Sequence, residues 1–111
     1  MTTPTQLPPD DLPPVIHDTQ PCIWVAFDID TTLHDTHGKP RWDIIHLLWI
    51  TSQYARIIVW STAGATHAAH HGRHLHLPDS IYYASKLNHP HTVDLTYDTQ
   101  DTTLGKVNIR V

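Results

Sequence analysis

Residues 23–33, IWVAFDIDTTL, place two aspartates directly after an apolar run. The first five residues, several of them β-branched or aromatic, predict a strand that is buried on both faces, as in a parallel sheet with helices on each side. Asp28 and Asp30 then fall beyond the carboxyl end of that strand, where open α/β sheets bind ligands. Two acids this close repel each other, and a divalent cation or a shared proton relieves the repulsion. The stretch predicts a metal site, although Asp also ends strands by stabilising turns and capping helices.

Length and composition indicate one small domain with an acidic balance. The chain has 111 residues, a net charge of -4 and one cysteine, Cys22, which is compatible with a reducing compartment. The absence of a basic block disfavours nucleic acid or an anionic membrane surface as the main partner. The longest apolar stretch, residues 44–50, is interrupted by His46 and is too short to span a bilayer, and the N-terminus lacks signal-peptide features. We therefore expect a soluble cytoplasmic protein; the pattern specifies no oligomeric state.

The remaining segments alternate between helical and extended patterns. Residues 1–21 hold six of the nine prolines and few apolar groups, so we expect an extended Pro-rich tail before a folded domain over 22–111. The patterns predict helices over 41–54 and, capped by Thr66, to about Leu75, and strands over 23–27, 56–60, 80–84, 92–97 and 106–111. The expected fold class is α/β, a Rossmann-like three-layer sandwich with a mainly parallel sheet of about five strands and no cap domain.

Polar side chains follow the predicted strands and would meet at one edge of a parallel sheet. In chain order they are Asp28 and Asp30, Ser61 and Thr62, Lys86, and Asp98 with Asp101 nearby. A carboxylate can attack phosphorus to give an acyl phosphate, which water then hydrolyses. Mg²⁺ suits an all-oxygen site, and hydroxyl and ammonium groups bind the remaining phosphoryl oxygens. The set therefore predicts phosphoryl transfer.

Residues 28–33, DIDTTL, resemble the opening D-x-D-x-T-[LV] signature of the haloacid dehalogenase-like superfamily of Rossmann-type phosphatases. The resemblance covers about residues 22–111. It implies that Asp28 is the nucleophile and a metal ligand. It also implies that Asp30 is the general acid and base and binds metal through its backbone carbonyl. Ser61 and Lys86 stand where the superfamily has its phosphate-binding hydroxyl and its lysine.

The fourth motif of the superfamily supplies the last metal-binding acid, and the resemblance assigns it to Asp98. The superfamily usually has two adjacent acids here, or acids four or five positions apart, whereas in this chain Thr99 follows and the next acid is Asp101. Asp94 is the competing candidate, but it falls inside the predicted strand and not at its end.

An acid at the position of Asp30 is typical of the phosphatases and phosphomutases of the superfamily, because a leaving alkoxide needs a proton donor. We therefore expect a Mg²⁺-dependent phosphomonoester hydrolase that forms an aspartyl phosphate on a phosphorylated substrate of unknown identity. One alternative is a non-catalytic module that serves assembly through the Pro-rich tail. Another is a polynucleotide 3′-phosphatase, which the acidic balance disfavours. Small stand-alone domains of this kind also resemble phage-encoded ones.

Histidine is the compositional outlier, with eleven copies. Four of them have helical spacing, which allows pairs of imidazoles to chelate zinc, but no Cys or carboxylate in that segment completes a site. We expect them to form a solvent-exposed helix face. Two more follow the aspartates, where a turn-forming role is favoured over substrate contact. These residues are His67, His70, His71 and His74 on the helix, and His34 and His37 in the loop.

Overall fold

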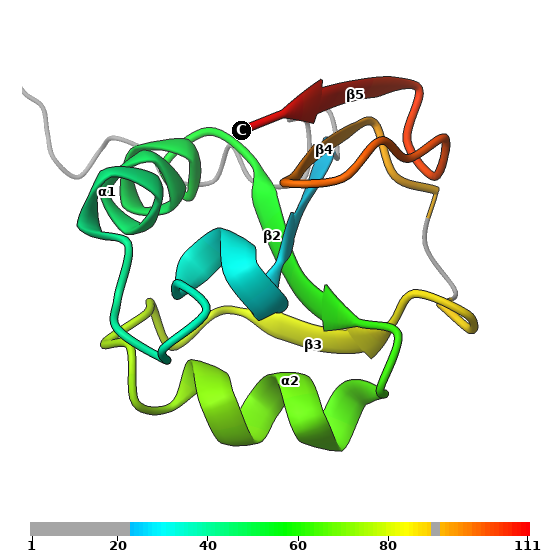
Figure 1. The fold of residues 1–111 in the computed structure, drawn as a ribbon. Helices are drawn as coiled ribbons and strands as arrows, with labels where there is room; N and C mark the ends of the chain where they lie inside the picture. The colour runs from blue at the N-terminus through cyan, green and yellow to red at the C-terminus, as the bar shows by residue number, and fades with distance from the viewer. Residues whose placement is uncertain (1–22, 90–91) are drawn as a thin grey trace, which may run out of the picture.

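The computed structural model describes residues 23–89 and 92–111, which form one five-stranded sheet and two α-helices (Figure 1). The expected tail, residues 1–21, lies outside the described residues. The strands are β1 (Trp24–Asp28), β2 (Arg56–Ser61), β3 (Tyr82–Ser85), β4 (Leu95–Asp98) and β5 (Val107–Arg110). Every neighbouring pair is parallel, so the expectation of an α/β fold with a parallel sheet of five strands is confirmed.

The strand order is β3-β2-β1-β4-β5, and it reverses direction at β1. In Figure 1, β5 forms the upper edge of the sheet and β3 the lower one. Asp28 pairs in register with Trp60, and Phe27 pairs with Tyr97, so the carboxyl ends of the three central strands lie close together. Ligands of open parallel sheets bind where the order reverses, here between the ends of β1 and β4.

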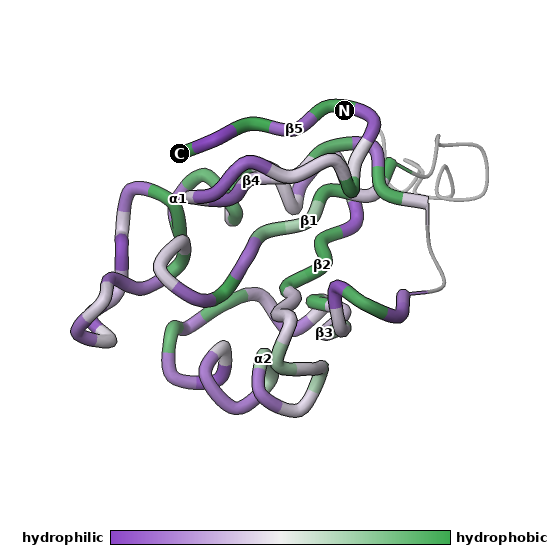
Figure 2. The backbone as a smooth tube through the Cα atoms, turned by 45° about the vertical axis from the view of Figure 1, so that its right-hand side comes forward, coloured by the Kyte–Doolittle hydropathy of each residue, from purple (hydrophilic) through white to green (hydrophobic). Residues whose placement is uncertain are grey.

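The helices α1 (Trp42–Thr51) and α2 (Ala65–Gly72) both pack on the same face of the sheet. The chain steps in one direction from β1 to β2 to β3, and right-handed crossovers then place both connecting helices on one face. Figure 2 shows that β2 consists mainly of hydrophobic residues, whereas α2 consists mainly of hydrophilic and near-neutral ones. The core between the helices and the sheet includes Val25, Phe27, Ile44, Leu48, Val59 and Ala68.

The opposite face of the sheet carries a smaller apolar cluster, and no helix within 23–89 or 92–111 covers it. Its buried members are Ala26, Ile58, Trp60, Ala84 and Val93, with Trp24 packed beside them. The connection from β3 to β4 is only nine residues long (86–94), shorter than the usual helical crossover between parallel strands, and its residues His89 and Val93 pack on this face. The expected three-layer sandwich is therefore not confirmed.

Several element boundaries differ from those predicted. Gly64, with φ of +112°, precedes α2 in a conformation that suits glycine, so Thr66 lies inside the helix and is not its cap. The helix ends at Gly72, and not near Leu75. The predicted strand over 92–97 begins only at Leu95, and the Asp94 carboxylate just before it accepts from the Trp24 backbone N–H, 2.9 Å away. In the described ranges, neither helix has the length and apolar character needed to cross a membrane.

Candidate functional site

A strained turn, η4 (Ile29–Leu33), connects β1 to the loop before α1 and holds the second aspartate. Thr31 in this turn has φ of +62°, a left-handed conformation that is rare for a β-branched residue and costs about 1–3 kcal/mol. Its hydroxyl lies 2.6 Å from the Asp30 carbonyl oxygen and 2.8 Å from the Thr99 hydroxyl, which ties the turn to the end of β4. The turn also separates the two carboxylates, and Asp28 and Asp30 contact different partners.

Asp28 and Asp98 share one ammonium group. The Lys86 Nζ lies 2.6 Å from Asp28 Oδ1 and 2.7 Å from Asp98 Oδ2. All three side chains are at most 13% exposed, and they come from the ends of β1, β3 and β4. The Thr32 hydroxyl donates to Asp28 Oδ2, and the Gln100 backbone N–H donates to Asp98 Oδ1. The structure thus brings together three of the predicted site residues at the reversal of strand order.

Lys86 attracts both carboxylates of this trio, whereas Asp28 and Asp98 repel each other. Burial raises the pKa of Asp28 to about 6, although the hydrogen bond and charge of Lys86 oppose the rise. Burial alone would lower the pKa of Lys86, but its hydrogen bonds to Asp28 and Asp98 outweigh that effect and hold the pKa above its usual value. Near neutral pH, Lys86 is therefore cationic and Asp28 is a carboxylate.

Asp30 points to a second group of side chains. Ser61 Oγ donates to Asp30 Oδ2 over 2.8 Å, and His67 Nε2 lies 2.8 Å from Asp30 Oδ1. Burial would raise the pKa of Asp30, but the hydrogen bonds from His67 and Ser61 outweigh it and hold the pKa below its usual value. Asp30 is therefore ionised at rest, and it accepts from both neighbours.

The contact of His67 with Asp30 is a feature that the sequence reasoning missed. His67 and His71 are partly buried, so the expectation of a uniformly solvent-exposed helix face does not hold for them. His70 and His74 are exposed, but His74 lies beyond the end of α2. The signal in the sequence was the short distance along the chain between Ser61 and the start of α2. Only residues 62–64 separate them, so the first turns of the helix lie close to the strand ends. His34 Nε2 also lies near Asp30 Oδ1, at 3.8 Å, and has no hydrogen-bond partner in the described residues.

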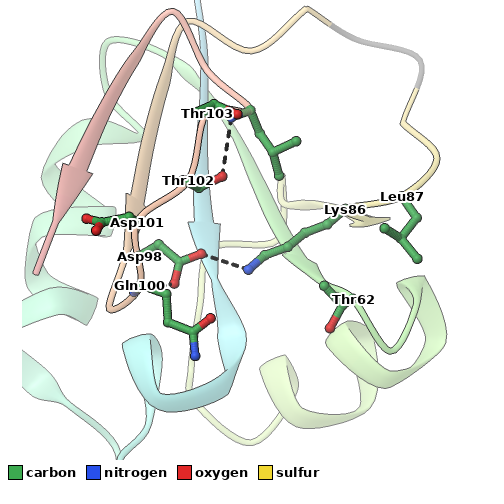
Figure 3. A pocket seen from close by; sticks show the side chains of 9 residues that line it. Thr62, Lys86, Leu87, Asp98, Gln100, Asp101, Thr102 and Thr103 are labelled. Carbon is green, nitrogen blue, oxygen red and sulfur yellow. Dashed lines mark hydrogen bonds and ion pairs between the residues drawn. The ribbon is translucent and has the colours of Figure 1, made fainter.

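Thr62 lines an open pocket of about 430 Å³ beside the trio. Figure 3 shows Lys86 reaching across this pocket to Asp98, with Thr62 on the wall below and the loop after β4 opposite. Asp101 belongs to that loop, but its side chain is 88% exposed and its carboxylate lies 3.8 Å from Arg110. The pocket therefore leaves open space next to Lys86.

Of the three acids considered for the fourth motif, Asp98 lies in the site and the other two do not contact its carboxylates. Asp94 is bound to the Trp24 backbone at the start of β1, and its other oxygen lies 3.3 Å from Lys106. It is therefore at the opposite end of the strands from Asp28.

His37 is exposed in the loop after η4, where its backbone N–H donates to the Asp35 carboxylate, as expected of a turn.

The donor atoms suit a hard cation with an incomplete protein shell. No group of three or more His, Cys, Asp or Glu side chains within the described ranges is arranged to hold a metal ion. Mg²⁺ commonly binds only one or two carboxylates and keeps several waters. Asp28 and Asp98 supply two buried carboxylates close together, while the Asp30 carbonyl oxygen accepts from Thr31. A cation bound here would interact with the same two carboxylates as Lys86.

Comparison of the chain with family models, with curated proteins and with solved structures gave no significant match.

Proposed function

We propose that this protein is a Mg²⁺-dependent phosphomonoester hydrolase of the haloacid dehalogenase-like type, acting through an aspartyl phosphate. The observation that carries the proposal is the buried trio in which Lys86 bridges Asp28 and Asp98 at the reversal of strand order. A buried, ionised carboxylate with a raised pKa in such a crevice is typical of a functional group. We also propose that the fold is a shortened Rossmann-like sandwich, in which the brief connection from β3 to β4 replaces a helical layer.

Asp28 is the proposed nucleophile. One of its oxygens attacks phosphorus, the bond from phosphorus to the leaving oxygen breaks, and that oxygen takes a proton from Asp30. In the second step Asp30 accepts a proton from water, the water oxygen attacks phosphorus, and phosphate leaves with Asp28 regenerated. Asp30 is ionised at rest, so it must take up a proton before the first step and is ready as a base for the second.

The surrounding groups stabilise the transferred phosphoryl group. Lys86 contacts Asp28, and the Ser61 hydroxyl donates to Asp30. Each group can therefore turn from its carboxylate to a phosphoryl oxygen of the substrate. Thr62 lies on the adjoining wall of the pocket. Mg²⁺, bound by Asp28 and Asp98, would neutralise the repulsion between the carboxylates and the anionic substrate.

A non-catalytic role is the second candidate, and one observation favours it. Lys86 already bridges Asp28 and Asp98 with its single positive charge, and Ser61 and His67 already contact the Asp30 carboxylate, so each of these aspartates has a protein partner without metal or substrate. In that case the fold would serve assembly through the Pro-rich tail. A polynucleotide 3′-phosphatase is a narrower form of the first candidate, but the pocket wall has two acids and one cation, which disfavours a polyanionic substrate.

The deciding experiment is hydrolysis of an aryl phosphate with and without Mg²⁺. We expect turnover that excess chelator removes and added Mg²⁺ restores. Asp28→Asn should abolish turnover while the circular dichroism spectrum stays unchanged, because the replacement is nearly isosteric. Asp43→Asn is the matched control, since Asp43 is exposed on α1. Turnover that survives the chelator would refute the metal assignment. No wild-type turnover on any phosphate ester would favour the non-catalytic role.

A further inference from the structure

The side chain of Asp30 has two strong anchors, and substrate binding removes one of them. Ser61 has a single hydroxyl proton, which it donates to Asp30 Oδ2 at rest. When that proton is donated to a phosphoryl oxygen, as the proposed function requires, the bond to Asp30 is lost. The anchor that remains is His67, whose Nε2 lies 2.8 Å from Oδ1, while His34 Nε2 is farther away at 3.8 Å.

We propose that His67 is a positioning residue, which holds the Asp30 carboxylate in place for proton transfer after Ser61 has turned to the substrate. This inference rests on the proposed function and assigns a role to a histidine that the reaction scheme does not otherwise use. Because the ionised carboxylate can only accept, the Nε2 nitrogen is the donor. With Oδ1 fixed by His67, Oδ2 is free to face the leaving oxygen.

The surroundings of His67 restrict its imidazole. It belongs to α2, a helix that packs closely on β3 through Gly72 and Tyr83. Its ring centroid is 4.4 Å from that of His71, and the His71 ring is 5.7 Å from that of His34. The helix and the neighbouring rings thus hold the imidazole over η4. A fixed donor of this kind matters because small displacements of a reacting group cost large factors in rate.

The variants that test this role are His67→Ala, His67→Gln and His70→Ala. The glutamine amide nitrogen can take the place of Nε2, so His67→Gln should keep most of the activity. His70→Ala is the matched control, because His70 is exposed on the same helix and its ring contacts are with His71 and His74 only among the described rings.

We expect His67→Ala to lower kcat for an alkyl phosphate at least about tenfold, with a smaller loss for an aryl phosphate and little change in KM. The alkyl leaving group depends more on proton donation, so this split reports on Asp30 and not on general damage. The double variant His67→Ala, Asp30→Asn should be no slower than Asp30→Asn alone, since both changes remove one function.

The outcomes separate this inference from the proposed function. Wild-type turnover with equal losses on both esters in His67→Ala, or with losses that multiply in the double variant, would overturn the role of His67 alone. Failure of His67→Gln to recover activity beyond His67→Ala would also count against it. A wild type that hydrolyses neither ester would overturn the proposed function and this inference with it.

Discussion

The negative charge of the Asp28 carboxylate lowers the stability of the folded state. Its side chain is almost fully buried, and burial raises its pKa to about 6 despite the neighbouring Lys86. The folded state therefore binds the proton more tightly than the unfolded state does. Stability contributed by this group is fully present below a pH of about 4 and is lost as the pH rises through about 6.

We predict that Asp28→Asn is more stable than the wild type at neutral pH. The free energy of unfolding should increase on the order of 1–3 kcal/mol, because the amide does not ionise. The gain should shrink as the pH falls from about 6 to about 4, where the wild-type carboxyl is protonated in the folded state. Urea unfolding of both proteins at several pH values measures the difference.

A gain that stays constant between pH 4 and 7 would show that ionisation of Asp28 is not its cause. Asp43→Asn serves again as the control, because its exposed carboxylate should change the stability by less than about 0.5 kcal/mol at every pH.

Asp30→Asn tests whether the second aspartate transfers protons. We predict that the variant still binds Mg²⁺, because the proposed ligands Asp28 and Asp98 and the Asp30 backbone carbonyl are all unchanged, yet hydrolyses alkyl phosphates at least about a hundredfold more slowly. Aryl phosphates should suffer less in the first step, since their leaving groups need less protonation. Steady-state rates on one ester of each type make the comparison. Small and equal losses would remove Asp30 from proton transfer.

Among the elements, α2 depends on a close approach to β3. A Cβ atom on Gly72 would lie 2.6 Å from the Tyr83 ring, nearer than carbon atoms approach in folded proteins. Tyr83 is itself packed against the main core, so its ring is not free to withdraw. The glycine at the end of α2 therefore sets the distance between helix and sheet, and with it the position of His67.

We predict that Gly72→Ala destabilises the protein by about 1–3 kcal/mol, because the added methyl group forces the helix and the Tyr83 ring apart. Chemical denaturation gives the magnitude. In a Tyr83→Ala background the same replacement should cost nothing, since alanine is the better helix former and the obstructing ring is absent. An equal loss in both backgrounds would mean that the contact with Tyr83 is not the reason.

For the molecule as a whole, the sheet has one face covered by helices and an open edge at its carboxyl ends. The connections from β1 to α1 and from β2 to α2 span residues 29–41 and 62–64, and neither contains an inserted domain. The pocket beside Lys86 accordingly opens to the surface. Under the proposed function, such an opening would admit a large substrate, or a partner's surface would close it.

We predict that removal of residues 1–20 leaves a folded domain with a similar melting temperature. This segment of the sequence has few apolar side chains and therefore contributes little hydrophobic burial. Differential scanning calorimetry of the full and shortened chains provides the measurement. A fall of many degrees would indicate that the segment packs on the domain, and it would strengthen the case for an assembly role.

The strands and the strand-end placement of the aspartates were predictable from residues 23–33 and 56–60, because apolar runs followed by polar residues specify buried strands and their ends. The ends of α2 were less predictable. Gly64 begins the helix through its backbone conformation, and Thr66 only looked like a cap. Local patterns identify the kind of element better than its last residue, since the ends depend on contacts with the rest of the fold.

The sequence by itself determined which side chains follow the buried strands, because each of these strands is a local apolar run that ends where polar residues begin. Only the tertiary structure decided how they pair. Lys86 joins Asp28 to Asp98, and Asp30 turns instead to Ser61 and His67. These partners are separated by 12 to 58 positions in the chain, and their meeting depends on strand order, helix placement and the strained turn after β1.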